Sequence, residues 1–243
     1  MPQPAHEVVA CLAGGLIASC QPVRGGVFDR PELVALFALA ALDGGAVGLR
    51  VESLADLRAV RGALDAAGRP VPITGLVKRE EPGTDVFITP QPDDVRALVA
   101  AGADVVAFDA TDRGRPVPVA EMIEAVHAEG ALAMADVATE AEGVAAHAAG
   151  ADFVATTLSG YVAGTPDLAG PDLELVARLV RCGARVVAEG RVATPIDAAA
   201  ARGRGAFAVT VGTAFSRPEW IVRAFVDAVR VAAATASGDG AGT

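Results

Sequence analysis

The chain has 243 residues, of which 52% are apolar and only 4% aromatic, so alanine, valine and leucine must fill its core. The formal net charge of −10 argues against general binding of nucleic acid or of an anionic membrane surface, although a small anion can still occupy a locally positive pocket. Three widely spaced cysteines and three scattered histidines lack the spacing of a disulfide framework or a metal site. The first residues do not resemble a signal peptide and no run resembles a membrane helix, so we expect a soluble cytoplasmic protein.

Eight short apolar runs alternate along the chain with helical patterns. Each run is typical of a strand that is buried on both faces, as in a parallel sheet. The predicted strands span residues 16–20, 46–50, 72–78, 105–110, 132–137, 153–158, 185–190 and 206–212. The predicted helices span residues 30–45, 53–68, 91–103, 118–130, 139–151, 171–184, 194–206 and 217–234.

Eight strand–helix units in a chain of this length predict a single (β/α)8 TIM barrel of the α/β class, formed by residues 1–234. The alternative is a doubly wound open sheet. It is less favoured because no Gly-x-Gly-x-x-Gly motif follows the first strand, and because eight regular units suit closure. The small and polar segment 235–243 is predicted to be a disordered tail.

Polar side chains stand at the carboxyl ends of the predicted strands, where barrel enzymes form their active sites. The residues at these positions are Cys20, Gln21, Arg50, Lys78, Arg79, Asp109, Asp136, Thr157, Glu189 and Gly212. Any one of them could belong to a loop salt bridge. Together they predict a functional site at this end of the barrel.

The segments "AEGR" and "VGTAFSRP" follow the seventh and eighth predicted strands, after which barrels often bind phosphate. Gly190, Gly212 and Thr213 allow close approach of the backbone to a ligand, and Arg191 and Arg217 supply positive charge. The alternative is that the glycines only permit tight turns. The two arginines favour an anion site.

Lys78 is the only lysine of the chain, and every other basic side chain apart from the histidines is arginine. Arginine is always charged, whereas lysine can lose its proton when burial or a neighbouring cation lowers its pKa. We therefore expect Lys78 to act as a base, with Arg79 and the barrel mouth depressing its pKa. The alternative is that a single lysine remains by chance in an arginine-rich composition.

The motifs "GGLIASCQ", "GGAVGLR", "VKRE", "DVFITP", "DATDR", "MADV", "TTLSGY", "AEGRVATP" and "VGTAFSRP" occur in this order over nearly the whole chain. In this series the chain resembles the N-acetylmannosamine-6-phosphate 2-epimerase family. The resemblance implies a cytoplasmic (β/α)8 enzyme of amino sugar and sialic acid breakdown. Such an enzyme interconverts N-acetylmannosamine 6-phosphate and N-acetylglucosamine 6-phosphate without a metal or an organic cofactor.

The resemblance also implies roles for individual residues. It makes Lys78 and Glu189 the acid–base pair, whereas the rival interpretation is that the two only form a salt bridge. Arg50 and Asp136 resemble the sugar-binding residues of the family, and Arg217 resembles its arginine at the phosphate end. Two further residues take roles from their position: Gln21 would hold the acetamido group or a hydroxyl, and Asp109 would orient Lys78 or Arg50.

Two other functions remain open from the sequence. One is a different phosphosugar isomerase or epimerase barrel, although its metal-dependent versions need histidines at the strand ends, where this sequence has none. The other is a barrel that binds a phosphosugar without turnover. The predicted last helix carries an apolar stripe with Trp220, Ile221, Phe225 and Val226, and some members of the family are dimers that use this helix, so we expect a homodimer.

Overall fold

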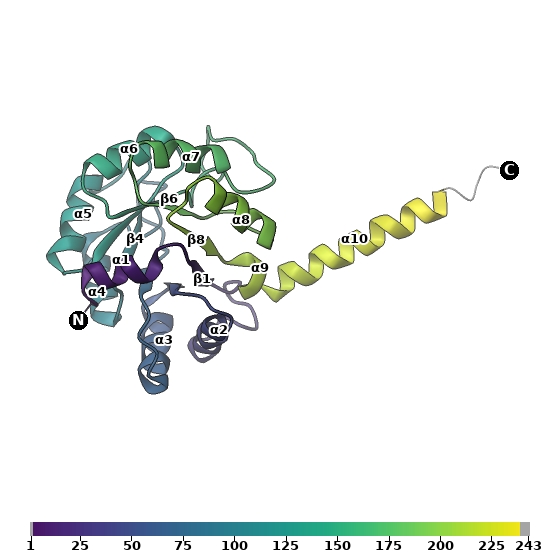
Figure 1. Cartoon of the computed structure of the whole chain (residues 1–243), viewed down its shortest axis with the longest axis horizontal. Coiled ribbons are helices and arrows are strands. Elements are labelled where there is room, and N and C mark those ends of the chain that lie inside the picture. Colours follow the sequence, from purple (N-terminus) through teal and green to yellow (C-terminus); the bar gives the residue numbers. More distant parts are fainter. Residues whose placement is uncertain (1, 239–243) are drawn as a thin grey trace.

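The computed structural model describes residues 2–238, which contain eight parallel strands closed into a barrel (Figure 1). The strands are β1 (Leu16–Cys20), β2 (Gly48–Glu52), β3 (Ile73–Leu76), β4 (Val105–Asp109), β5 (Leu132–Asp136), β6 (Phe153–Ala155), β7 (Val186–Ala188) and β8 (Ala208–Val211). Each strand pairs in parallel with the next along the chain, and β8 pairs with β1. The predicted (β/α)8 barrel is therefore confirmed, and the open sheet is excluded.

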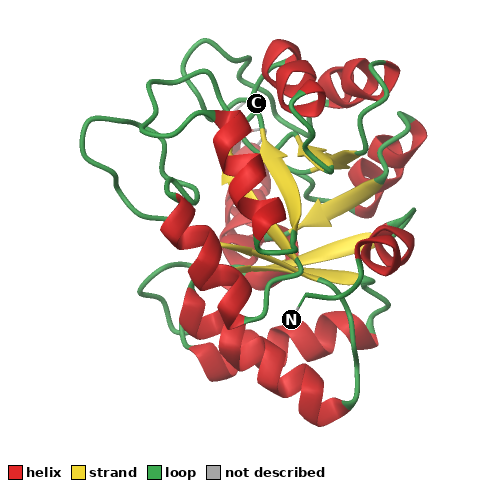
Figure 2. Cartoon of the chain, turned by 90° about the vertical axis from the view of Figure 1, so that its left-hand side faces the viewer, coloured by secondary structure: helices red, strands yellow, loops and turns green. Residues whose placement is uncertain are grey.

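Helices surround the strands on the outside of the barrel, as Figure 2 shows in red around yellow. They are α2 (Pro31–Asp43), α3 (Leu54–Ala67), α4 (Pro92–Ala101), α5 (Val119–Ala128), α6 (Glu140–Ala148), α7 (Leu173–Arg181) and α8 (Pro195–Gly203). The elements α1 (Ala5–Leu12), α9 (Thr213–Ser216) and α10 (Pro218–Gly238) lie at the two ends of the chain. Neither α1 nor the short α9 was predicted from the sequence.

Local sequence signals fix where several helices begin. Thr139 and Thr194 each accept a hydrogen bond from the backbone three residues later, and an acidic side chain at that position bonds back to the first residue. Ser53 caps α3 in the same way by accepting from the backbone of Asp56. These caps place the start of each helix directly after a loop at the mouth of the barrel.

The apolar core has two layers because strand side chains alternate between the barrel interior and the helices. An inner cluster includes Ile17, Val105 and Phe153 from the strands. Val8 and Leu12 of α1 belong to the same inner cluster and are almost fully buried. The helix α1 therefore packs against the interior of the barrel, while polar side chains occupy the mouth at the carboxyl ends of the strands.

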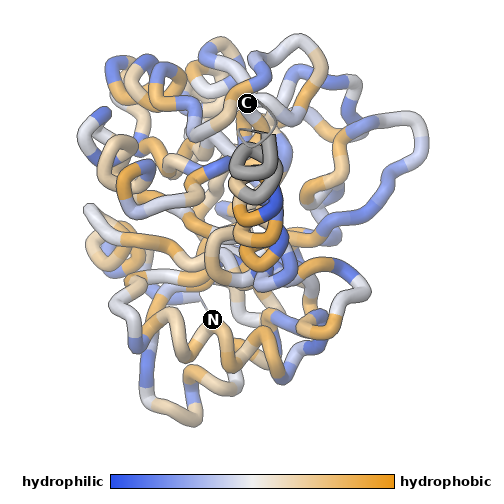
Figure 3. The backbone as a smooth tube through the Cα atoms, turned by 90° about the vertical axis from the view of Figure 1, so that its right-hand side faces the viewer, coloured by the Kyte–Doolittle hydropathy of each residue, from blue (hydrophilic) through white to orange (hydrophobic). Residues whose placement is uncertain are grey.

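The helix α10 projects away from the barrel instead of packing along it (Figure 1). Several of its apolar side chains are exposed: Trp220, Val222, Phe225, Val226 and Val229. Figure 3 shows the orange, apolar face of this helix end-on. The helix reaches Gly238, four residues into the segment predicted as a tail, and residues 239–243 of that segment lie outside the described residues. Within the described residues, no helix is long and apolar enough to cross a membrane.

Candidate active site

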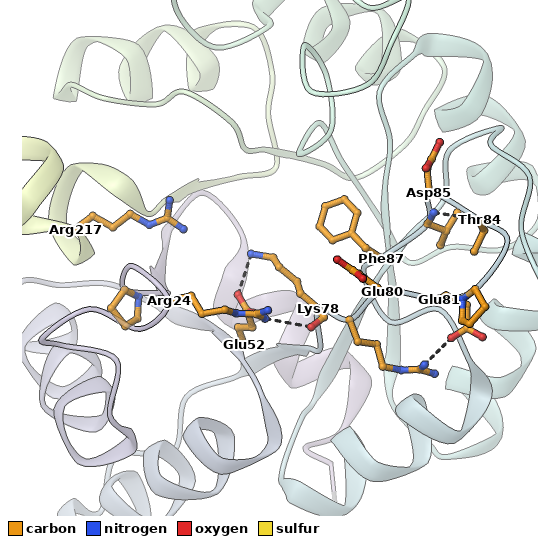
Figure 4. A pocket seen from close by; sticks show the side chains of 13 residues that line it. Arg24, Glu52, Lys78, Glu80, Glu81, Thr84, Asp85, Phe87 and Arg217 are labelled. Carbon is orange, nitrogen blue, oxygen red and sulfur yellow. Dashed lines mark hydrogen bonds and ion pairs between the residues drawn. The ribbon is translucent and has the colours of Figure 1, made fainter.

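The barrel mouth holds a cavity of about 510 Å³, and an outer cavity of about 890 Å³ adjoins it. Lys78, Phe87 and Arg217 line both cavities and so stand where the two meet (Figure 4). The inner cavity is also lined by these predicted site residues: Gln21, Thr157, Glu189, Gly190, Arg191, Gly212 and Thr213. Predicted site residues from the ends of five different strands thus surround one space.

Beneath the inner cavity lies a buried group that we call the floor network: Arg50, Asp136 and Glu189. The guanidinium of Arg50 donates to the Asp136 carboxylate at 2.6 and 3.3 Å, and Arg50 Nε lies 3.2 Å from Glu189 Oε1. The Arg50 and Asp136 side chains are 2% and 0% exposed. Thr157 donates a further hydrogen bond to Asp136. Asp136 therefore holds Arg50 in this structure, whereas the resemblance made both of them sugar-binding residues.

Two atoms of the floor network are buried without a hydrogen-bond partner among the described residues, namely Arg50 Nε and Glu189 Oε2. The pKa of Glu189 is raised to about 7, chiefly by burial and in addition by the charge of Asp136, while the cations of Arg50 and Lys78 act in the opposite direction. A carboxyl group with this pKa can either donate or accept a proton near neutral pH. Because Glu189 also lines the cavity, it is suited to acid–base chemistry.

The lysine at the mouth belongs to a second group, the rim cluster: Gln21, Arg24, Glu52 and Lys78. The Lys78 ammonium donates to Gln21 Oε1 at 2.6 Å and forms an ion pair with Glu52 Oε2 at 2.9 Å. Figure 4 shows this ion pair and Arg24 on the other side of Glu52. The carboxylate paired with Lys78 in this structure is thus Glu52, although Lys78 and Glu189 line the same cavity.

Arg79 does not join the rim cluster. Its guanidinium donates to Glu81, in the same loop, and to Asp94, in the first turn of α4. The expectation that Arg79 lowers the pKa of Lys78 therefore finds no support in these contacts. Asp109 also lies apart: it accepts hydrogen bonds from Thr111 and Arg113 rather than from Lys78 or Arg50.

The predicted phosphate loops border the inner cavity on the side of β7 and β8. Arg217 Nε donates to the backbone carbonyl of Gln21 at 3.0 Å, which holds its guanidinium beside the end of β1, at the wall of the cavity. At Gly212 an added Cβ would lie 3.2 Å from the Cβ of Ser19, which is closer than ordinary contact. The absence of a side chain at Gly212 therefore lets this loop pack tightly against β1.

Arg191, the second arginine of the predicted anion site, contacts a neighbouring loop. Its guanidinium donates to the carbonyls of Ser159 at 2.7 Å and Gly170 at 3.0 Å, and it lies 4.8 Å from the centre of the Tyr161 ring. All three partners belong to the long loop between β6 and α7. The backbone of Arg191 has a φ of 53°, which is costly for a residue other than glycine. In this structure the side chain thus binds the β6–α7 loop.

Two features of the site escaped the sequence prediction. Glu52 was missed because the second strand was predicted to end at Arg50, whereas β2 continues to Glu52. Since side chains two apart on a strand share a face, an extension of the strand would have placed Glu52 beside Arg50. The aromatic side chains of Tyr161 and Trp220 also line the cavity, and nothing in the local sequence indicates their direction. Cys20, predicted at the mouth, instead packs in the outer core.

A closed parallel barrel with charged side chains at the carboxyl ends of its strands defines the class of (β/α)8 barrel enzymes. Across the described residues, no three histidine, cysteine, aspartate or glutamate side chains are grouped as a metal site would need. The barrel also resembles a thiamine phosphate pyrophosphorylase from Pyrococcus furiosus, with a TM-score of 0.56 and 17% identity, which reflects the fold alone.

Closer similarities define the family. The family described as "Putative N-acetylmannosamine-6-phosphate epimerase" matches residues 34–231. A "Putative N-acetylmannosamine-6-phosphate 2-epimerase" of Yersinia pseudotuberculosis (strain YPIII) is 52% identical over 219 residues, which cover 90% of this chain and 91% of that protein. The N-acetylmannosamine-6-phosphate 2-epimerase structure from Clostridium perfringens is 33% identical, with a TM-score of 0.87 and coverage of 93% of this chain and 98% of that one. The chain belongs to the N-acetylmannosamine-6-phosphate 2-epimerase family.

Proposed function

We propose that this chain is an epimerase that interconverts N-acetylmannosamine 6-phosphate and N-acetylglucosamine 6-phosphate by inverting C2, a step of amino sugar and sialic acid breakdown. Family membership over most of the chain carries the proposal. The site supports it because a lysine and a carboxyl group with a pKa of about 7 line the same cavity. Those are the two kinds of group that proton transfer at carbon requires.

The chemistry follows from the substrate. The C2 proton of the closed sugar ring is hardly acidic, whereas in the open-chain aldehyde it lies next to a carbonyl group. Its removal gives an enolate whose negative charge rests on oxygen. The protein must therefore take a proton from C2 on one face, return one on the other face, and stabilise the oxyanion between the two steps.

Lys78 and Glu189 are proposed as the two groups that move the proton. Lys78 enters the mouth from the loop after β3, and Glu189 enters from the end of β7. The two residues therefore approach a bound sugar from different sides of the barrel. A protonated Glu189 can also assist ring opening by donating to the ring oxygen. The cation of Arg50 beneath them is placed to stabilise an oxyanion near Glu189.

The remaining predicted residues are proposed to bind substrate. Gln21 would hold the acetamido group or a hydroxyl, while Arg50 and Asp136 form the polar floor under the sugar. The phosphate would lie against Gly190, Gly212 and Thr213, with Arg217 supplying charge. Arg191 was also predicted to bind the phosphate, but its contacts with the β6–α7 loop support a role in holding that loop beside the phosphate. The reaction needs no metal or organic cofactor, so we expect its rate to be unchanged by a chelator.

The test is a proton NMR time course of N-acetylmannosamine 6-phosphate with the enzyme in D2O. We expect the gluco epimer to appear with deuterium at C2, and we expect neither change with Lys78→Ala. Full conversion by Lys78→Ala at the wild-type rate would contradict the role of Lys78. No conversion of either epimer by the wild type would contradict the epimerase proposal itself.

We further propose that the enzyme is a homodimer and that it acts in the cytoplasm, where sugar phosphates are made and consumed. The dimer is supported by the exposed apolar side chains of α10, which projects from the barrel. Leu36 of α2 and Ile196 of α8 are also exposed, at 60% and 80%, on the helices that flank the β8–β1 side of the barrel. Light scattering should give twice the chain mass of 24.3 kDa, and Phe225→Asp should reduce it to the monomer.

A further inference from the structure

Lys78 contacts a carboxylate for which the proposed reaction has no direct use. Glu52 lines the outer cavity, whereas Glu189 lines the inner one, and Lys78 borders both. The ammonium of Lys78 lies 2.9 Å from Glu52 Oε2. Lys78 therefore stands between two carboxylates and pairs with the outer one.

The two acceptors of the Lys78 ammonium are each held by another group. Gln21 accepts from Lys78 through Oε1, and its amide nitrogen donates to Ser19 Oγ at 2.8 Å. Glu52 uses Oε2 for Lys78, and its Oε1 accepts from Arg24 at 2.6 Å. Arg24 also donates to the backbone carbonyl of Lys78 at 3.1 Å. The position of the ammonium is thus set by a small network and not by one contact.

The backbone under Glu52 is fixed as well. Glu52 is the last residue of β2 and stands opposite Leu76, the last residue of β3. The next residue, Ser53, has a φ of 76° and donates its backbone N–H to the Leu76 carbonyl at 2.9 Å. Glu52 is therefore anchored to the strand that leads to Lys78, two residues before the lysine.

Lys78 needs such an anchor because its own side chain is long and only partly enclosed. The Lys78 side chain is 28% exposed, and it follows the end of β3 by two residues. A free lysine side chain samples many rotamers, and fixing it costs conformational entropy. Proton transfer at carbon demands a well-defined distance and direction, and a misplacement of about 1 Å can lower the rate about 100-fold.

We propose that Glu52 is the positioning residue for Lys78: it holds the ammonium at the junction of the two cavities, with Arg24 orienting its carboxylate. The inference rests on the proposed epimerase function. Without Glu52 the ammonium is free to turn toward the other nearby carboxylate, Glu189. The two groups meant to act on opposite faces of C2 would then neutralise each other.

The kinetic test compares Glu52→Gln and Glu52→Ala with a matched control, Glu80→Gln. Glu80 is an exposed carboxylate two residues after Lys78 that lines the same outer cavity. We expect Glu52→Ala to lower kcat about 10- to 100-fold with KM changed less than about 3-fold, because the catalytic group is displaced and the binding groups are not. Glu52→Gln should lose less, since its amide oxygen can still accept from Lys78. Glu80→Gln should match the wild type.

The second readout does not depend on turnover. Because Lys78 is the only lysine, protein labelled with 13C-lysine gives one side-chain signal. In the substrate-free wild type we expect the relaxation of its ε-methylene group to report a restricted side chain. Glu52→Ala should make it mobile, and Arg24→Met should do so in part. A combined Arg24→Met/Glu52→Ala variant should be no worse than Glu52→Ala alone, because Arg24 acts through Glu52.

The outcomes separate the two proposals. An inactive wild type whose Lys78 becomes mobile in Glu52→Ala would overturn the epimerase function and leave the contact intact, so Glu52 would lose its role in that reaction. A kcat of Glu52→Ala within about 2-fold of the wild type, or an unchanged Lys78 signal, would overturn the positioning role. If Glu52→Ala does not fold, the same two measurements are made on Glu52→Gln and Arg24→Met. A wild-type kcat and an unchanged Lys78 signal in both of these variants would then overturn the positioning role.

Discussion

The floor network and the rim cluster each join an arginine to carboxylates, in opposite surroundings. In the floor, the Arg50 side chain is 2% exposed and contacts Asp136 and Glu189, which come from two other strands. In the rim, the Arg24 side chain is 73% exposed and contacts Glu52 from a loop. Both networks lie at the same mouth, and each holds one of the two residues proposed to move the C2 proton.

The difference shows how one site can hold two kinds of acid–base group. Burial of the floor removes water from Glu189 and raises its pKa, so the carboxyl can act near neutral pH. The rim leaves Lys78 partly in water, where its proton can exchange with solvent between turnovers. The buried floor network therefore raises the pKa of Glu189, whereas the more exposed rim cluster holds the Lys78 ammonium in position.

The largest effect is expected from Lys78→Arg. The change keeps the positive charge and the pairing with Glu52, but arginine is not deprotonated in proteins. We expect kcat to fall by at least about 10³-fold, or about 4 kcal/mol, while substrate binding changes little. Single-turnover kinetics together with calorimetric titration of the substrate would measure both. A loss of binding without loss of kcat would reassign Lys78 to the substrate phosphate.

The next largest effect separates the two arginines by stability. Arg50→Met leaves the buried Asp136 and Glu189 carboxylates without their cation, which should cost about 3–5 kcal/mol of unfolding free energy. Arg24→Met removes an exposed partner of Glu52 and should cost at most about 1 kcal/mol. Urea denaturation of the two variants gives the comparison directly. If the two variants lost the same unfolding free energy, burial would not make the floor network more important for stability than the rim cluster.

A third prediction uses the raised pKa of Glu189. Since the pKa is about 7 in the folded protein and 4.5 is its ordinary value, the folded state binds the proton more tightly than the unfolded chain. The stability of the wild type should therefore fall, relative to Glu189→Gln, as pH rises from about 4.5 to about 7. Above pH 7 the variant should be more stable, by about 3 kcal/mol.

The measurement is a series of urea denaturations between pH 4 and 8, with the exposed Glu80→Gln as the control for a lost surface charge. A constant difference between Glu189→Gln and the wild type across this range would show that Glu189 ionises as an ordinary carboxyl group. Glu189→Gln should also lose activity. A buried carboxylate that lowers the stability of the protein is expected to be retained because the reaction needs it.

Much of the floor could be predicted from the sequence, because strand positions decide it. Arg50, Asp136 and Glu189 stand at the ends of strands whose apolar runs are clear, and closure of the barrel brings such ends together. The rim could be predicted only in part. Lys78 was found by its rarity, but Glu52 lies beyond the predicted end of its strand, and Arg24 lies in a loop whose path no local pattern fixes.

The direction of the Arg191 side chain and the surface that covers the apolar stripe of α10 could not be predicted from the sequence either. Arg191 stands where the phosphate loop was predicted, and its turn toward Ser159 depends on the conformation of the β6–α7 loop, in which Ser159 lies 32 positions earlier in the chain. The stripe on α10 predicts a buried face, but the same pattern suits burial against its own barrel or against a second copy. The short helix α1 carries too few turns to form a clear period.

The smallest effect is expected from Arg191, and it decides between two roles. If Arg191 acts by holding the β6–α7 loop, Arg191→Met should free Tyr161 and raise the rate of chymotrypsin cleavage there about 10-fold. Binding of inorganic phosphate, followed by calorimetry, should then be nearly unchanged. Arg217→Met should show the reverse pattern, with weaker phosphate binding and normal cleavage. Weakened phosphate binding in Arg191→Met without faster cleavage would return Arg191 to the anion site predicted from the sequence.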